Sequence, residues 1–157
     1  MLQSRDQIVL TADSVFGAIK TFLAGDPLGD IEAIKNFVRN LTADYTFKDV
    51  HDINGWELCI TVTDSRKDSN QRLLNYITDP DVTIWSAVCA SCSIPEFFGT
   101  QKLYTKNPTT GQIEEYYSPE IQAGLNGNGR FVDGSISCDI PTKRVAELFG
   151  VNTFIVS

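Results

Sequence analysis

The stretch Glu57-Leu-Cys-Ile-Thr-Val-Thr63 is the part of this sequence that decides the fold class. It is rich in β-branched residues and lacks clean alternation of apolar and polar residues, which is typical of a strand covered on both faces. Before it, the segment from Gln7 to Leu23 carries apolar residues at a mainly helical spacing. The combination of helices with a covered strand predicts an α/β fold.

A second helix is expected between the first helix and this strand. Asp30 is a good N-cap for it. Charged and amide side chains occupy the opposite face, so the helix should be half buried. Its apolar stripe consists of Ile31, Ile34, Phe37, Val38 and Leu41.

Beyond the strand, small residues and prolines define the next elements. Val82–Cys92 is rich in small residues and is followed by Pro95, which favours a buried helix. The segment from Gly99 to Gly129 is rich in turn residues, with short strand-like pieces such as Lys102–Tyr104, and is expected to be a surface excursion.

The C-terminal part alternates between strand and helix. Arg130–Val132 is a short apolar strand, and Pro141–Phe149 is a helix with proline in its first turn and Gly150 at its end. The last residues, Thr153–Ser157, are β-branched and apolar, which predicts an interior strand leading into something larger.

Composition limits the class of protein. The 157 residues, 42% of them hydrophobic, are enough for one globular domain, and the net charge of -7 disfavours nucleic acid as a partner. Apolar runs of the ~18–20 residues that span a bilayer are missing, as is a secretory signal pattern. The sequence therefore predicts a cytosolic or peripheral protein with four reduced cysteines.

Strong catalytic signatures are absent: the sequence has no G-x-S-x-G elbow, no P-loop and no H-E-x-x-H. The single histidine, His51, lies among aspartates that are common in solvated turns, so a loop position is expected. Cys89-Ala-Ser-Cys92 has the C-x-x-C spacing of a redox or zinc site. Because the pair falls within an expected helix, buried structural thiols are the preferred interpretation, and no metal is predicted.

Four aspartates are candidates for chemistry. Asp79, Asp81 and Asp139 stand beside proline or at helix entrances, where aspartate usually caps a helix or forms a turn. Asp133 follows a short strand and precedes Gly134, a placement where α/β folds collect functional groups. Taken alone, an Asp-Gly pair after a strand is more often a turn than a catalytic base, so the residues by themselves leave both interpretations open.

Three ordered blocks carry a resemblance to a known family. They are Leu73–Pro95, Arg130-Phe-Val-Asp-Gly-Ser-Ile-Ser-Cys-Asp-Ile-Pro141 and Glu147–Ser157. Together they resemble patatin-like phospholipases, in particular the branch of storage-lipid triacylglycerol lipases. The resemblance covers roughly Thr46–Ser157, with a weaker continuation at Gly29–Glu32.

The resemblance implies a three-layer α/β/α fold and a serine–aspartate dyad. The aspartate of the family's D-G-[GA] motif corresponds to Asp133, followed by Gly134 and by Ser135, where glycine or alanine is commoner. That carboxylate would take the serine proton directly, without histidine or cofactor, and burial beside an apolar pocket would strengthen it as a base. The resemblance also implies a wall beside the acyl chain, formed by Trp85, Val88, Pro95, Phe97 and Phe98.

One departure from the family limits the functional prediction. The nucleophile elbow and the glycine-rich oxyanion loop have no counterpart here, and none of the serines near the matched blocks stands between glycines on a strand–turn–helix. Those serines are Ser86, Ser91, Ser93 and Ser137. We therefore expect residues 1–157 to be a partial patatin-like domain that lacks its N-terminal strands.

Three functional hypotheses follow. The first is part of a lipid acyl-ester hydrolase, acting on triacylglycerol or phospholipid, of whose dyad only Asp133 is present. The second is a non-catalytic module that binds a lipid droplet or membrane surface. The third is the product of an incomplete gene model, with an open sheet edge. Whether the chain is itself an enzyme stays open at this point.

Overall fold

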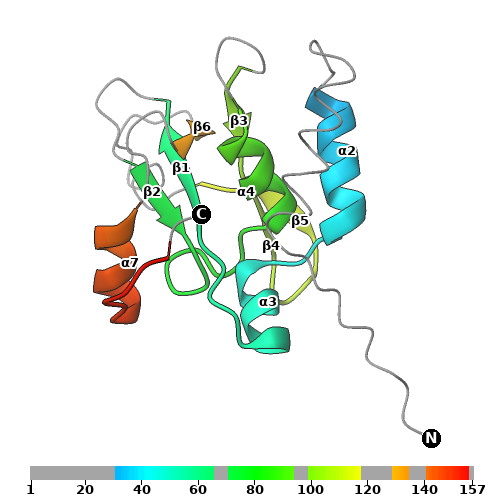
Figure 1. The fold of residues 1–157 in the computed structure, drawn as a ribbon. Helices are drawn as coiled ribbons and strands as arrows, with labels where there is room; N and C mark the ends of the chain where they lie inside the picture. The colour runs from blue at the N-terminus through cyan, green and yellow to red at the C-terminus, as the bar shows by residue number, and fades with distance from the viewer. Residues whose placement is uncertain (1–30, 66–70, 94–98, 118–128, 135–140, 156–157) are drawn as a thin grey trace, which may run out of the picture.

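The computed structural model describes residues 31–65, 71–93, 99–117, 129–134 and 141–155. Helices and strands are both present, which confirms the α/β prediction (Figure 1). The helix expected over Gln7–Leu23 lies outside the described residues, as does the expected cap Asp30. The described elements are α2 (Ile31–Thr42), α3 (Phe47–Asn54), β1 (Ile60–Asp64), β2 (Gln71–Leu74), α4 (Ile84–Ser91), β3 (Gln101–Lys102), β4 (Tyr104–Lys106), β5 (Ile113–Glu115), β6 (Arg130–Asp133) and α7 (Thr142–Phe149).

Four of these strands form one antiparallel sheet in the order β2-β1-β6-β3. The predicted strand over Glu57–Thr63 corresponds to β1, which begins three residues later, at Ile60. β6 pairs with β1 on one side and with β3 on the other. β6 is therefore an interior strand, although among the described strands its last two residues, Val132 and Asp133, pair with β1 alone. Strands β4 and β5 form a separate antiparallel pair.

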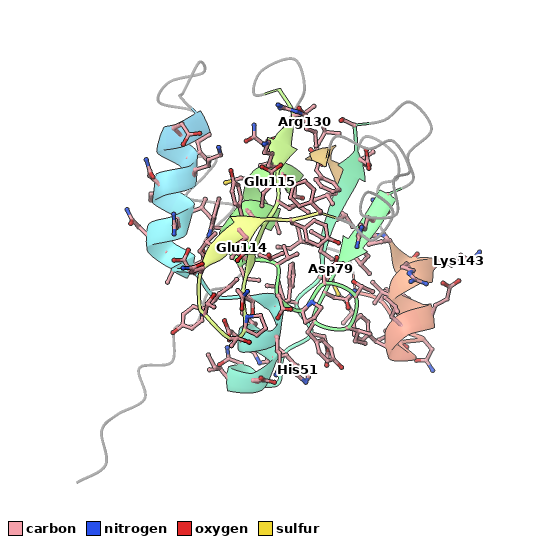
Figure 2. All side chains as sticks on the ribbon, turned by 180° about the vertical axis from the view of Figure 1, so that it is seen from behind. His51, Asp79, Glu114, Glu115, Arg130 and Lys143 are labelled. Carbon is pink, nitrogen blue, oxygen red and sulfur yellow. The ribbon has the colours of Figure 1, made fainter. Side chains whose placement is uncertain are left out.

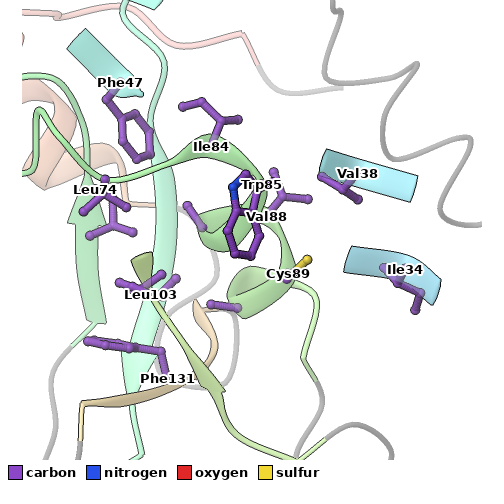
Figure 3. Packing of buried hydrophobic residues seen from close by; sticks show 14 residues of the cluster. Ile34, Val38, Phe47, Leu74, Ile84, Trp85, Val88, Cys89, Leu103 and Phe131 are labelled. Carbon is purple, nitrogen blue, oxygen red and sulfur yellow. The ribbon is translucent and has the colours of Figure 1, made fainter. Parts of the chain in front are cut away.

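Helix α4 is the centre of the hydrophobic core. It packs against β1, β3 and β6, while α2 packs on α4 (Figure 3). All residues from Ile84 to Ala90 are buried, which confirms the buried helix predicted over Val82–Cys92. Ser86, Ala87 and Ala90 are small, so the helix can approach its neighbours closely.

Helix α2 only partly follows its predicted apolar stripe. Ile34 and Val38 are buried in the core cluster, as predicted, and Phe37 packs at its margin. Leu41 is 38% exposed, so its predicted burial is wrong. Among the described elements α2 packs chiefly on α4, and residues turned away from α4 stay accessible.

Helix α3 is an element that the sequence analysis did not predict. Its N-terminus is a capping box, in which the Thr46 hydroxyl accepts from the Asp49 amide at 3.1 Å and the Asp49 carboxylate accepts from the Thr46 amide at 3.0 Å. Gly55 ends the helix in the left-handed region, at φ 68°. His51 is therefore a helical residue, and the prediction of a loop histidine is wrong.

The segment from Gly99 onward is only in part the predicted surface excursion: residues 108–112 are exposed, but its first strand belongs to the main sheet. β3 forms the edge of the main sheet, with Gln101 opposite Phe131 of β6. Leu103, which follows β3, is fully buried in the core cluster. The predicted surface excursion is therefore wrong for β3 and Leu103, because β3 pairs with a strand almost thirty residues later in the chain.

The C-terminal helix is confirmed, but the strand expected after it is not. α7 spans Thr142–Phe149 and ends at Gly150, which has φ 65°. In the described part beyond it, residues 151–155 form no strand, and Ile155 is 96% exposed. An apolar β-branched run needs a neighbouring strand to become part of a sheet, and no described strand lies beside this one.

A buried ion pair joins three segments on one side of the core. The Asp79 carboxylate, 1% exposed, accepts from the Arg72 guanidinium at 2.6 Å and from the Tyr116 hydroxyl at 2.8 Å. The Arg72 guanidinium also lies 5.5 Å from the centroid of the Tyr116 ring. Figure 2 shows Asp79 between α3, which carries His51, and the sheet. Asp79 stands in a turn, as predicted, but the N-cap of α4 is Thr83.

Candidate active site

Asp133 is the last residue of β6, and the end of α4 contacts it. Its register partner is Val62 on β1. The Asp133 amide donates to the backbone carbonyl of Ser93 at 3.0 Å, and the Ser93 hydroxyl in turn donates to the Cys89 carbonyl at 2.6 Å. The side chain of Asp133 is half-buried. A carboxylate is thus attached to a rigid backbone and still reachable at the end of an interior strand.

Gly134 follows in a position that has no space for a side chain. A Cβ built on Gly134 would lie 2.5 Å from Thr61 Oγ1 and 2.7 Å from the Thr61 carbonyl carbon. The second contact is with the backbone of β1, which cannot rotate away as a flexible side chain can. The Gly134 carbonyl accepts from Gln71 Nε2 at 3.0 Å. The glycine of the Asp-Gly pair is therefore required sterically.

Replacing Gly134 by alanine should destabilise the protein through this contact. We expect Gly134→Ala to lower the free energy of unfolding by about 2 kcal/mol, because overpacking forces β1 or β6 to shift. Gly55→Ala is the comparison: Gly55 has φ 68°, which strains any side chain, whereas a Cβ there meets nothing within 4 Å. That substitution should cost about 1 kcal/mol, from backbone strain alone. Urea unfolding of both variants measures the difference, and equal costs would contradict the contact with Thr61.

The thiols around the site stay protonated at neutral pH. Burial, and to a smaller extent the negative charge of Asp133, raise the pKa of the Cys92 thiol to about 11. Burial likewise raises the pKa of Cys89 to about 12 and that of Cys59 to about 11. A redox or zinc role needs accessible thiolates. In the described ranges, no group of three or more potential ligands could bind a metal ion.

Two of the four candidate serines are buried and bonded, which makes them unsuitable as nucleophiles. Ser86 Oγ donates to the Thr83 carbonyl at 3.0 Å and accepts from the Tyr104 amide at 3.1 Å. The Ser93 hydroxyl is fully buried and occupied by the Cys89 carbonyl. Ser91 lies half-buried in the last turn of α4, and Ser137 lies outside the described residues.

Comparison with known proteins identifies the family of the chain. A family model described as "Patatin-like phospholipase" matches residues 5–146. The chain belongs to the patatin-like phospholipase family. No solved structure matches the chain.

The patatin-like chain is also similar to curated triacylglycerol lipases. It is 40% identical to triacylglycerol lipase SDP1L of Arabidopsis thaliana, over 91% of this chain and 18% of that protein. It is 34% identical to triacylglycerol lipase ptl3 of Schizosaccharomyces pombe, over 92% of this chain and 28% of that protein. Triacylglycerol lipase 5 of Saccharomyces cerevisiae is 36% identical over 98% of this chain and 19% of that protein. The chain thus spans less than a third of the length of each.

The acyl-wall residues expected for a patatin-like protein divide into two groups. Trp85 and Val88 are buried in the core, where the Trp85 indole stacks on Tyr104 with centroids 5.1 Å apart and donates to Asp44 at 3.1 Å. The second group, Pro95, Phe97 and Phe98, lies outside the described residues. The motif residue Ser135 lies outside them as well. A wall beside an acyl chain therefore stays a prediction.

Three residues that shape the candidate site were not predicted from the sequence: Thr61, Gln71 and Ser93. Thr61 and Gln71 belong to strands more than sixty residues before Gly134. Ser93 was weighed only as a nucleophile, whereas its carbonyl binds the Asp133 amide. None of these contacts has a local sequence signature, because each depends on the pairing of distant elements.

Proposed function

We propose that this chain is part of a lipid acyl-ester hydrolase, acting on triacylglycerol through a serine–aspartate dyad in which Asp133 is the base. The observation that carries the proposal is the Asp133–Gly134 pair at the end of an interior strand, with Gly134 closely packed against Thr61. A simple turn would not require glycine directly after the last residue of an interior strand. Membership of the patatin-like family supports ester hydrolysis.

In the proposed reaction the Asp133 carboxylate accepts the proton of a serine Oγ while that oxygen attacks the ester carbonyl. The tetrahedral intermediate collapses to an acyl-enzyme, and the proton passes to the departing alcohol. Asp133 then takes a proton from the water that attacks the acyl-enzyme and passes it to the serine Oγ as the fatty acid leaves. His51 takes no part, because it lies on α3 with its ring stacked on Tyr76 at 3.8 Å. The reaction needs no cofactor.

The serine and the oxyanion donors would come from residues outside these 157. We propose that the four-stranded sheet belongs to a larger three-layer α/β/α patatin-like domain, of which residues 1–157 are one part. The absence of a G-x-S-x-G motif from the sequence supports this arrangement. Triacylglycerol is the preferred substrate class because the similar proteins are named triacylglycerol lipases, and phospholipid is the alternative ester.

The decisive experiment uses the protein expressed from its complete natural reading frame. It should hydrolyse an emulsion of a long-chain triacylglycerol and react with a fluorophosphonate, which labels activated serines. The 157 residues expressed alone should do neither. Absence of both activities from the complete protein, when it is folded, would sink the proposal. If the fluorophosphonate labels the complete protein but triacylglycerol is not hydrolysed, the dyad is supported and the substrate must be a different ester.

Attachment to a lipid surface is a second candidate function, favoured by exposed apolar side chains at one end of the molecule. Ile53 is 63% exposed, Trp56 53% and Ile77 48%. The stack of His51 on Tyr76 brings α3 and the turn after β2 together. Within the described residues no helix is long and apolar enough to cross a bilayer. On the exposed apolar side chains of α3 and the turn after β2, we propose peripheral association with lipid droplets or membranes, from the cytoplasm.

Removing two of these side chains should weaken binding to lipid. We expect the double variant Ile53→Ser, Trp56→Ser to bind triolein droplets about thirtyfold more weakly, since transferring such side chains into lipid contributes about 1 kcal/mol each. Flotation with the droplets measures the bound fraction. Tyr117→Ser is the matched control, because Tyr117 is similarly exposed, at 50%, and follows β5. If Tyr117→Ser weakened droplet binding as much as the double variant, the proposal that this surface binds lipid would be refuted.

A further inference from the structure

We propose that Gln71 is a positioning residue for the base Asp133, an inference that rests on the proposed dyad. Gln71 is the first residue of β2 and pairs with Thr63 of β1. Its side chain reaches across β1, and its Nε2 donates to the Gly134 carbonyl at 3.0 Å. The two residues are 63 positions apart in the chain. Gln71 thus connects the edge strand to the residue that follows the base.

The hydrogen bond matters because of where it lies relative to Asp133. The peptide group before Asp133 is fixed by its amide, which donates to the Ser93 carbonyl at 3.0 Å. The peptide group after Gly134 is fixed by Gln71. Peptide groups are planar, so fixing both ends leaves the backbone of Asp133 and Gly134 little freedom. The direction of the Cα–Cβ bond of Asp133 is then determined.

Gly134 makes this second attachment necessary. Glycine has no Cβ and restricts its own dihedral angles less than any other residue. Thr61 blocks movement of Gly134 toward β1, but a close contact on one side does not prevent movement away from it. The Gln71 amide supplies the attraction that opposes such movement. A base placed about 1 Å from its proper position can lose a large part of its rate, even when the fold is intact.

The test replaces Gln71 by methionine in the complete, active protein. Methionine has a similar length and cannot donate, so we expect kcat for triacylglycerol hydrolysis to fall about tenfold, with KM changed by less than about twofold. Gln71→Glu is the second variant: it keeps size and polarity at this half-buried position, and when ionised it cannot donate. It should lose at least as much kcat. The matched control is Gln101→Met, on the other edge strand β3, whose kcat should stay at the wild-type value once folding is verified.

A double variant separates positioning from a general effect on the fold. If Gln71 acts through Asp133, Gln71→Met should cause no further loss in the Asp133→Asn background, because the two changes remove the same function. A tenfold loss in that background as well would overturn the inference, as would wild-type kcat in both Gln71 variants. Full activity of Asp133→Asn itself would instead refute the proposed dyad, which keeps the two failures distinguishable.

Discussion

Asp133→Asn is expected to lower kcat of the complete protein by about 10³-fold, because the amide cannot accept the serine proton. The substitution preserves the shape of a half-buried side chain. It also leaves in place the hydrogen bond from the backbone amide of residue 133 to the Ser93 carbonyl. Folding and substrate binding should therefore survive, and KM should change little. Steady-state hydrolysis of a triacylglycerol emulsion measures the loss. A variant that keeps more than a tenth of wild-type kcat would exclude Asp133 as the base.

The same variant has a second readout that does not depend on catalysis. The charge of Asp133 helps to raise the pKa of the Cys92 thiol to about 11. Removing that charge should lower the pKa of Cys92, so the thiolate forms at lower pH and alkylation by iodoacetamide becomes faster between about pH 9 and pH 11. Asp81→Asn is the control and should change neither kcat nor the alkylation rate. An unchanged Cys92 profile in Asp133→Asn would mean that the two side chains are not close.

The second large effect is expected for Asp79→Ala, on stability. The Asp79 carboxylate is 1% exposed and accepts from both Arg72 and Tyr116. Its removal takes away the negative charge that the largely buried Arg72 guanidinium and the Tyr116 hydroxyl share as an acceptor, which should lower the free energy of unfolding by about 3 kcal/mol. Urea unfolding monitored by circular dichroism measures the change, and the midpoint should fall while the slope is unchanged.

A surface ion pair provides the comparison for Asp79. Arg144 and Glu147 on α7 lie 3.3 Å apart with side chains 55% and 49% exposed. Glu147→Ala should change stability by less than about 0.5 kcal/mol, because water screens such a pair. If Asp79→Ala lowered the free energy of unfolding as little as Glu147→Ala does, the contacts of Asp79 would contribute no more to stability than a surface ion pair.

Local sequence patterns were sufficient for elements whose structure depends mainly on residues within the same segment. The small, apolar composition of α4 predicted a buried helix, and the proline and glycine around α7 predicted its two ends. Asp133 could be selected because an aspartate followed by glycine after a short strand is a local pattern. The capping box of α3 was present in the sequence as Thr46 and Asp49, and recognising it would have placed His51 on a helix.

Patterns failed where a distant partner decides the structure. Leu103 is buried because β3 pairs with β6, and the turn residues around it give no indication of that pairing. The apolar residues near the C-terminus remain exposed because none of the described strands pairs with them. Gln71 and Thr61 shape the site only after β1, β2 and β6 are adjacent. Their roles follow from register, which periodicity within a single segment does not reveal.

The pairing of Val62 with Asp133 also has a consequence for how the protein folds. Capped helix α3 and the adjacent pair β1–β2 involve neighbouring residues and can form early, whereas β1 and β6 meet only after the long intervening chain has closed into a loop. Closing such a loop has an entropic cost that slows the search for the native state. The contacts that orient Asp133 therefore belong to a late folding step, and substitutions in β6 should alter the refolding rate less than the unfolding rate.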